Sequence, residues 1–323
     1  MSQFIISGSP HVHGPESTRR IMLDIIIALT PAILVALYYF GWYAFRLTVI
    51  SVAACVLTEW LIQKYLLKVP TTVGDLSAVV TGILLAFNVP ANLPVWMIIV
   101  GSVVSIGIAK MSFGGLGHNP FNPALVGRVF LLISFPTAMT TWPKVSPIFE
   151  NGFFADAITG PTPLGLLKES AGSFSKMEYL DMLLGARGGA FGEMCAIALV
   201  LGGLYLIIRR VIDVWTPLVI LATVFAFTGI CYLIDPATYI APIYHIFYGG
   251  LILGAFFMAT DMVTSPMTRG GKIIFAFGIG VITTVIRLWG AYPEGVSFAI
   301  LIMNALVPLI NRGFRPKRFG AKK

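Results

Sequence analysis

The chain has 323 residues, of which 57% are hydrophobic and only 11% are charged, and its formal net charge is +8. Soluble domains carry roughly 25% charged residues, so this composition excludes a soluble globular protein of the same length. The basic residues lie at the ends of apolar runs and in a C-terminal tail, which favours a membrane topology signal over nucleic-acid binding.

The apolar runs predict an all-α polytopic membrane protein with about ten transmembrane helices. The predicted spans are 21–40, 44–67, 75–88, 95–111 and 124–135 in a first half, and 190–208, 215–233, 243–258, 273–289 and 296–310 in a second half. The chain then divides into an N-terminal arm (1–20), a first transmembrane half (21–142), a polar loop (143–187), a second transmembrane half (188–311) and a basic tail (312–323). Five spans per half make the halves inverted with respect to the bilayer, as in transporter folds.

Glycine and proline predict that three helices are broken, near 75–90, 113–128 and 259–266. Broken backbone at membrane depth is tolerated where protein buries it or where it lines a cavity. We therefore expect these segments inside the protein or at a cavity.

Basic residues gather in the loops on one side of this topology. They are Arg19, Arg20, Lys64, Lys68, Lys110, Arg209, Arg210, Arg269, Lys272 and the residues of the tail. The positive-inside rule then places both termini in the cytoplasm and the 143–187 loop on the outer side of the membrane.

The outer loop contains the segment Asp156-Ala157-Ile158-Thr159-Gly160-Pro161-Thr162. Its small residues, hydroxyls and Gly-Pro pair on their own predict an exposed turn. Thr162 presents a hydroxyl at this turn, which suits a covalent modification.

This segment resembles the flavinylation motif of a family of membrane subunits. The family comprises the D subunit of the Rnf complex, an ion-translocating ferredoxin:NAD oxidoreductase, and the B subunit of the sodium-translocating NADH:quinone reductase. Asp156, Thr159, Gly160 and Thr162 match the motif, and Pro161 replaces its usual alanine. The likeness also includes 11–20, 75–90, 114–128, 261–266 and the tail, and so covers essentially the whole chain; the chain length and the single motif favour the Rnf branch.

The resemblance implies a covalent FMN, joined to Thr162 through a phosphoester bond. Asp156, Thr159 and Gly160 are then recognition elements for a flavin transferase. It also implies a non-covalent riboflavin, sister subunits that carry iron–sulfur clusters and flavins, and coupling to Na⁺ or H⁺ translocation in the bacterial cytoplasmic membrane.

Ferredoxin and NAD chemistry is expected on other subunits. The chain has no G-x-G-x-x-G fingerprint in a βαβ setting, and three cysteines cannot supply four cluster ligands. We expect no metal site on this chain alone and no complete active site, although a cluster shared with a partner stays open.

Asn119 and Asn122 follow a glycine-rich break at a helix opening. Related subunits hold riboflavin near such an Asn-bearing stretch, and amide groups suit the donor–acceptor edge of a flavin. Arg128 lies about one turn beyond and is expected at the same pocket. The alternative is that both asparagines cap broken backbone.

Asp75, Asp261 and Glu59 are candidates for an ion path, because acidic groups in or beside spans tend to pair or conduct. For any one of them, a helix cap or an interface residue is the favoured explanation. For the whole chain, the alternative function is a non-redox channel or secondary transporter with inverted repeats.

Overall fold

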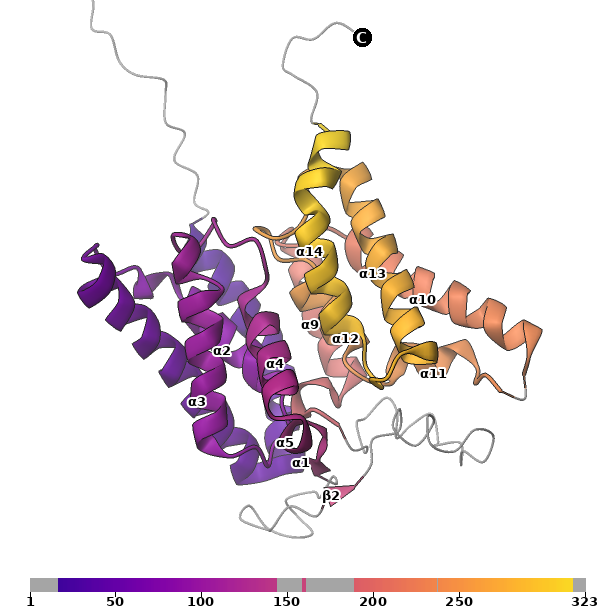
Figure 1. The fold of residues 1–323 in the computed structure, drawn as a ribbon, viewed down its shortest axis with the longest axis horizontal. Helices are drawn as coiled ribbons and strands as arrows, with labels where there is room; N and C mark the ends of the chain where they lie inside the picture. The colour runs from indigo at the N-terminus through magenta and orange to yellow at the C-terminus, as the bar shows by residue number, and fades with distance from the viewer. Residues whose placement is uncertain (1–16, 144–158, 161–188, 237, 316–323) are drawn as a thin grey trace, which may run out of the picture.

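A computed structural model describes residues 17–143, 159–160, 189–236 and 238–315. Helices make up most of this part of the chain, in two groups that follow the two halves of the sequence (Figure 1). Helix α1 begins and helix α14 ends at one end of the molecule, and the short strand β2 lies at the opposite end (Figure 1).

The first half starts with α1, which is bent at Gly41. The backbone there has φ 51° and ψ −127°, a conformation that a residue with a Cβ rarely adopts. The predicted spans 21–40 and 44–67 are therefore two arms joined at this glycine. The elements are α1 (Thr18–Leu61), η1 (Ile62–Leu67), η2 (Val73–Asp75), α2 (Ser77–Phe87), α3 (Val95–Val103), η3 (Val104–Ile108), η4 (Met111–Phe113), α4 (Pro123–Ser134) and α5 (Pro136–Thr140).

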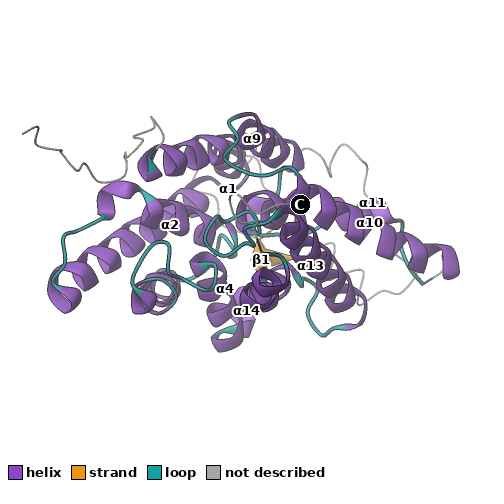
Figure 2. Cartoon of the chain, turned by 90° about the horizontal axis from the view of Figure 1, so that it is seen from above, coloured by secondary structure: helices purple, strands orange, loops and turns teal. Residues whose placement is uncertain are grey.

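The second half repeats the mixture of long helices and short broken ones. Its elements are η5 (Phe191–Glu193), α9 (Ala196–Ile208), α10 (Trp215–Ile234), α11 (Pro242–Phe247), α12 (Leu251–Leu253), η6 (Gly254–Met258), α13 (Arg269–Trp289) and α14 (Val296–Gly313). Helix α4 of the first half lies beside α14 of the second half (Figure 2). Helix α13 packs against α14, α10 packs against α13, and α11 packs against α10.

Five helical stretches in the described residues are long and apolar enough to cross a membrane, among them the bent 18–67 stretch. Shorter apolar helices are Ser77–Phe87, Pro123–Ser134 and Ala196–Ile208. These lengths confirm an all-α membrane protein, whereas the count of ten spans stays a prediction.

The three predicted breaks are present. Helix α2 ends at Phe87, the chain from 114 to 122 is irregular before α4, and irregular backbone follows Met258. Every residue of α2 except Val79 is buried, so this short helix is enclosed by protein. One apolar core runs through both halves.

Little of the 143–187 loop is described. Strand β1 (Trp142–Pro143) pairs antiparallel with β2 (Thr159–Gly160), with Trp142 opposite Gly160. Asp156 and Thr162 lie outside the described residues.

Candidate functional site

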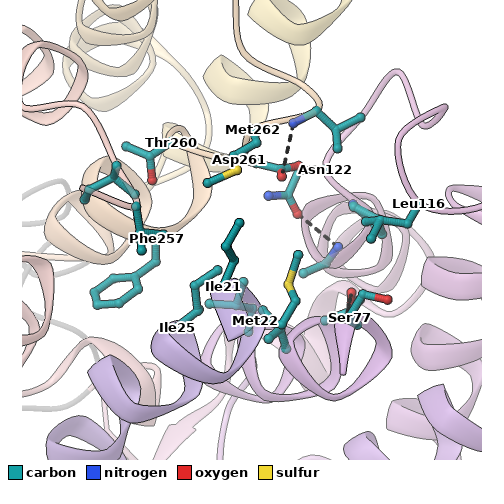
Figure 3. Close-up of a pocket in the computed structure, with 18 of the residues that line it drawn as sticks. Ile21, Met22, Ile25, Ser77, Leu116, Asn122, Phe257, Thr260, Asp261 and Met262 are labelled. Carbon is teal, nitrogen blue, oxygen red and sulfur yellow. Dashed lines mark hydrogen bonds between the residues drawn. The ribbon is translucent and has the colours of Figure 1, made fainter. Parts of the chain in front are cut away.

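A cavity lies where broken segments of the two halves meet (Figure 3). Its volume is about 220 Å³. This is somewhat below the roughly 300–1,000 Å³ of typical small-molecule sites, and the cavity is not fully enclosed. The described lining residues are Thr18, Ile21, Met22, Ile25, Ser77, Val80, Thr81, Leu84, Lys110, Leu116, Asn119, Asn122, Pro123, Ala124, Leu206, Val211, Ile212, Phe256, Phe257, Thr260, Asp261, Met262 and Val263.

Asn122 lines this cavity and also caps α4. Its Oδ1 accepts hydrogen bonds from the N–H groups of Ala124 (3.1 Å) and Leu125 (3.4 Å). Its Nδ2 donates to the carbonyl of Met258 at 3.2 Å, across the junction of the two halves. The Asn122 side chain therefore caps a helix, as the alternative interpretation expects. One of its two Nδ2 protons makes no hydrogen bond to the described residues.

Asn119 is buried on the same wall, and its amide is only half used. Its Nδ2 donates to the carbonyl of Phe121 at 3.1 Å. Its Oδ1 is buried and accepts no hydrogen bond from the described residues. A buried acceptor without a donor costs about 1–3 kcal/mol, so a ligand that brings a donor would relieve this cost.

Asp261 reaches the cavity from the irregular segment after η6 (Figure 3). Its carboxylate accepts from the N–H of Val263 at 3.5 Å and from the hydroxyl of Thr264 at 3.1 Å. It takes part in no salt bridge with the described residues.

The other two acidic candidates lie behind the cavity wall. Lys110 Nζ contacts Glu59 Oε2 and Ser77 Oγ, each at 2.6 Å, and Ser77 donates to Asp75 Oδ1 at 2.6 Å. Lys110 and Glu59 are 1% and 0% exposed, so this ion pair is fully out of water. The structure thus joins Glu59 and Asp75 through one network and leaves Asp261 separate.

Arg128 does not line this cavity, and its place at the second flavin stays a prediction. Its guanidinium contacts Glu294 Oε2 at 2.7 Å, Asn88 Oδ1 at 3.0 Å and Ser297 Oγ at 2.5 Å. The physical reason is Glu294, a partly buried acid that attracts Arg128 to the junction of α4 and α14. Sequence reasoning missed Glu294, although an acid beside a span signals a buried partner.

Thr159 and Gly160 are the described part of the Asp156–Thr162 segment. They lie in β2, at the end of the molecule away from the start of α1 (Figure 1). The cavity includes Thr18, at the start of α1. Strand β2 and the cavity are therefore at opposite ends of the molecule.

No group of three or more His, Cys, Asp or Glu residues in the described ranges has the arrangement of a metal site. Cys55, Cys195 and Cys231 are buried and separate.

The fold defines an all-α membrane protein, and the cavity lies where its two halves meet. The chain belongs to the NQR2, RnfD, RnfE family, whose model matches residues 5–320.

Relatives similar to this chain over nearly all of both sequences are D subunits of ion-translocating oxidoreductase complexes. The chain is 48% identical to that of the Na⁺-translocating ferredoxin:NAD⁺ oxidoreductase complex of Acetobacterium woodii, over 98% of this chain and 96% of the relative. It is 45% identical to that of the proton-translocating ferredoxin:NAD⁺ oxidoreductase complex of Clostridium ljungdahlii, over 99% and 97%. It is 41% identical to that of the ion-translocating oxidoreductase complex of Stutzerimonas stutzeri, over 94% and 93%.

Proposed function

We propose that this chain is the flavin-carrying electron-transfer subunit of a membrane complex that couples ferredoxin:NAD oxidoreduction to ion translocation. The family and the names of the relatives support the complex. The observation that supports the flavin is the cavity, whose lining residues include Asn119 with its buried, unpaired Oδ1.

The cavity residues fit the ring of a riboflavin. An isoalloxazine has a flat apolar body and one edge with an N–H donor between two carbonyl acceptors. Asn119 Oδ1 would accept a hydrogen bond from the ring N–H. The remaining Nδ2 proton of Asn122 would be donated to a ring carbonyl. Ile21, Met22 and Phe257 supply apolar surface for the ring faces.

The second flavin is FMN on Thr162. The described part of the motif, β2, supports a position at the end of the molecule opposite the cavity. When bound, flavins exchange electrons with both one-electron and two-electron partners. The protein would hold the two flavins at opposite ends of the molecule. Its apolar helices would exclude water from the region between the two flavins.

The positive-inside pattern supports an orientation with the cavity and both termini on the cytoplasmic side of the bacterial inner membrane and Thr162 on the outer side. Partners would be the iron–sulfur and flavin subunits of an Rnf-type complex, a flavin transferase and membrane lipid. The coupling ion is Na⁺ or H⁺, and similar relatives are named for each.

The test uses the complex purified from its native host. Mass spectrometry of the peptide that contains Thr162 is expected to show the added mass of FMN, and acid extraction is expected to release riboflavin. Thr162→Ala removes the covalent flavin alone, whereas Thr140→Ala, an exposed hydroxyl on α5, leaves it in place.

Asn119→Leu is expected to lower riboflavin affinity by roughly 2- to 10-fold, because one net hydrogen bond contributes about 0.5–1.5 kcal/mol. Asn311→Leu, which lies outside the cavity, is the matched control. A native complex with unmodified Thr162 and no releasable riboflavin would contradict the proposal and favour a non-redox transporter.

A further inference from the structure

Asp261 differs from the other acids near the cavity in what surrounds it. Glu59 is paired with Lys110, and Asp75 is bonded by Ser77. Asp261 has neutral donors, and it takes part in no salt bridge with the described residues.

The described cavity lining is mostly apolar and includes two charged residues, Lys110 and Asp261. Lys110 is already held by Glu59 and Ser77. Elements α1, α2, α4, α9 and η6 otherwise contribute neutral residues to the wall around Asp261. An apolar surrounding with no cation paired to it disfavours the charged form of a carboxyl group, so this carboxyl is suited to hold and release a proton.

The cavity also gives Asp261 access to water. The neighbouring lining residue Met262 is 52% exposed, and Thr18 is exposed at the same opening. A carboxyl between an apolar chamber and its open mouth has a route for reprotonation. Proton transfer needs heavy atoms within about 2.6–3.2 Å or one bridging water, and a place on the cavity wall brings Asp261 into contact with whatever the cavity binds.

We propose that Asp261 is the residue that exchanges a proton with the ring bound in this cavity. The inference rests on the proposed function. Complete reduction consumes two electrons and two protons per ring. An iron–sulfur partner supplies the electrons, Asp261 supplies one proton from a carboxyl oxygen, and water at the mouth supplies the other and reprotonates the carboxylate.

The plain alternative is that Asp261 only orders the turn that precedes α13, through Val263 and Thr264. A turn residue affects stability and the amount of bound ligand. It does not make the rate of reduction respond to added small acids, and it contributes no titrating carboxyl.

The experiment uses the full-length chain, made without a flavin transferase so that Thr162 stays unmodified, in detergent with riboflavin added. Reduction by dithionite is followed by rapid mixing. At equal bound riboflavin, Asp261→Asn is expected to slow reduction by about 10²–10⁴-fold, the usual contribution of a positioned acid. Formate buffer restores part of the rate, and Asp261→Glu retains most of it.

Asp213→Asn is the matched control, because Asp213 pairs with Lys272 and does not line the cavity. Reduction of Asp261→Asn at the wild-type rate overturns the inference while the riboflavin site stands. Wild-type chain that binds no riboflavin overturns the proposed occupant and this inference with it.

Should Asp261→Asn fail to bind riboflavin, infrared titration of the riboflavin-free chain decides. A protonated-carboxyl band that disappears in Asp261→Asn and persists in Asp213→Asn supports the inference. A spectrum in which Asp261→Asn removes no such band overturns it.

Discussion

Lys110 holds its ammonium group where water does not reach. Its partner Glu59 is 0% exposed, and Gln63 Nε2 also contacts Glu59 at 3.3 Å. The attraction between two buried opposite charges offsets the free-energy cost of removing them from water, and this attraction is lost when either charge is removed. The pair therefore makes the first half sensitive to the loss of either member.

Lys110→Met is expected to cost about 3–5 kcal/mol of unfolding free energy, because it leaves Glu59 buried without its cation. The double variant Glu59→Gln/Lys110→Met should recover most of this loss. Reversible unfolding in detergent, followed by tryptophan fluorescence, measures both. Lys272→Met is the control, since its pair with Asp213 is partly exposed and should be worth at most about 1 kcal/mol.

The sequence indicates which charged residues need an ion-pair partner, but it does not identify the partner. An acid inside a span predicted that Glu59 is paired, and the structure supplies Lys110, 51 positions along the chain. Arg128 meets Glu294, 166 positions away, a partner that the sequence alone does not indicate. Hydropathy and spacing describe one segment at a time, so pairings between segments are beyond their reach.

Helix α2 depends on a close approach to the second arm of α1. A Cβ on Gly82 would lie 2.6 Å from the Cα of Val52, which is backbone and cannot rotate away. Ser51 Oγ donates to the Gly82 carbonyl at 2.8 Å at the same contact. Small residues let membrane helices pack at this distance.

Gly82→Ala is expected to destabilise the protein by about 1–3 kcal/mol, because two helix backbones must separate. Gly107→Ala is the matched control within η3, where the new Cβ would meet Ile62 Cδ1 at an ordinary 3.5 Å. The control should be neutral or slightly stabilising. Thermal unfolding in detergent compares the two, and equal losses would contradict this account of the α1–α2 contact.

Element boundaries were predictable where an apolar run ends at a charge or a proline, as for α10 and α14. They were less predictable where the backbone breaks inside a run. The predicted span 243–258 is two pieces, α11 and α12–η6, and the span 190–208 begins as a helix only at Ala196. Inside an apolar run, tertiary packing decides where the helical backbone hydrogen bonding ends. The residue types on either side of such a boundary are alike, so the sequence does not mark it.

At the scale of the whole molecule, charged contacts join the two halves at both ends. Asp24 on α1 accepts from Tyr205 (2.9 Å) and contacts Arg209 (3.2 Å) at the end of α9. Farther along, Arg128 on α4 pairs with Glu294 in the turn between α13 and α14. The cavity lies between parts that these contacts hold in place.

Glu294 contacts three other segments of the chain: α4, α13 and the start of α12. It contacts Arg128 at 2.7 Å and Arg287 at 3.9 Å, and accepts a hydrogen bond from the Gly250 N–H at the start of α12. Burial on its own raises the pKa of this carboxyl, but Arg128 and Arg287, with the Gly250 N–H, outweigh it and hold the pKa below its usual value. The ionised form is therefore the one that joins the halves.

A lowered pKa in the folded state gives stability that is present above the unfolded value, near about 4.3, and is lost as pH falls through the folded value. At pH 7, Glu294→Gln is expected to cost roughly 3–5 kcal/mol, because Arg128 and Arg287 lose their carboxylate. Below about pH 4.3 the gap between wild type and variant should narrow, since protonated Glu294 resembles Gln. Thermal unfolding in detergent from pH 7 to pH 3 measures this gap, with Asp213→Asn, in a partly exposed pair, as a control whose gap stays small throughout. A gap for Glu294→Gln that is the same at both ends of this range would mean that the ionised carboxylate does not hold the two halves together.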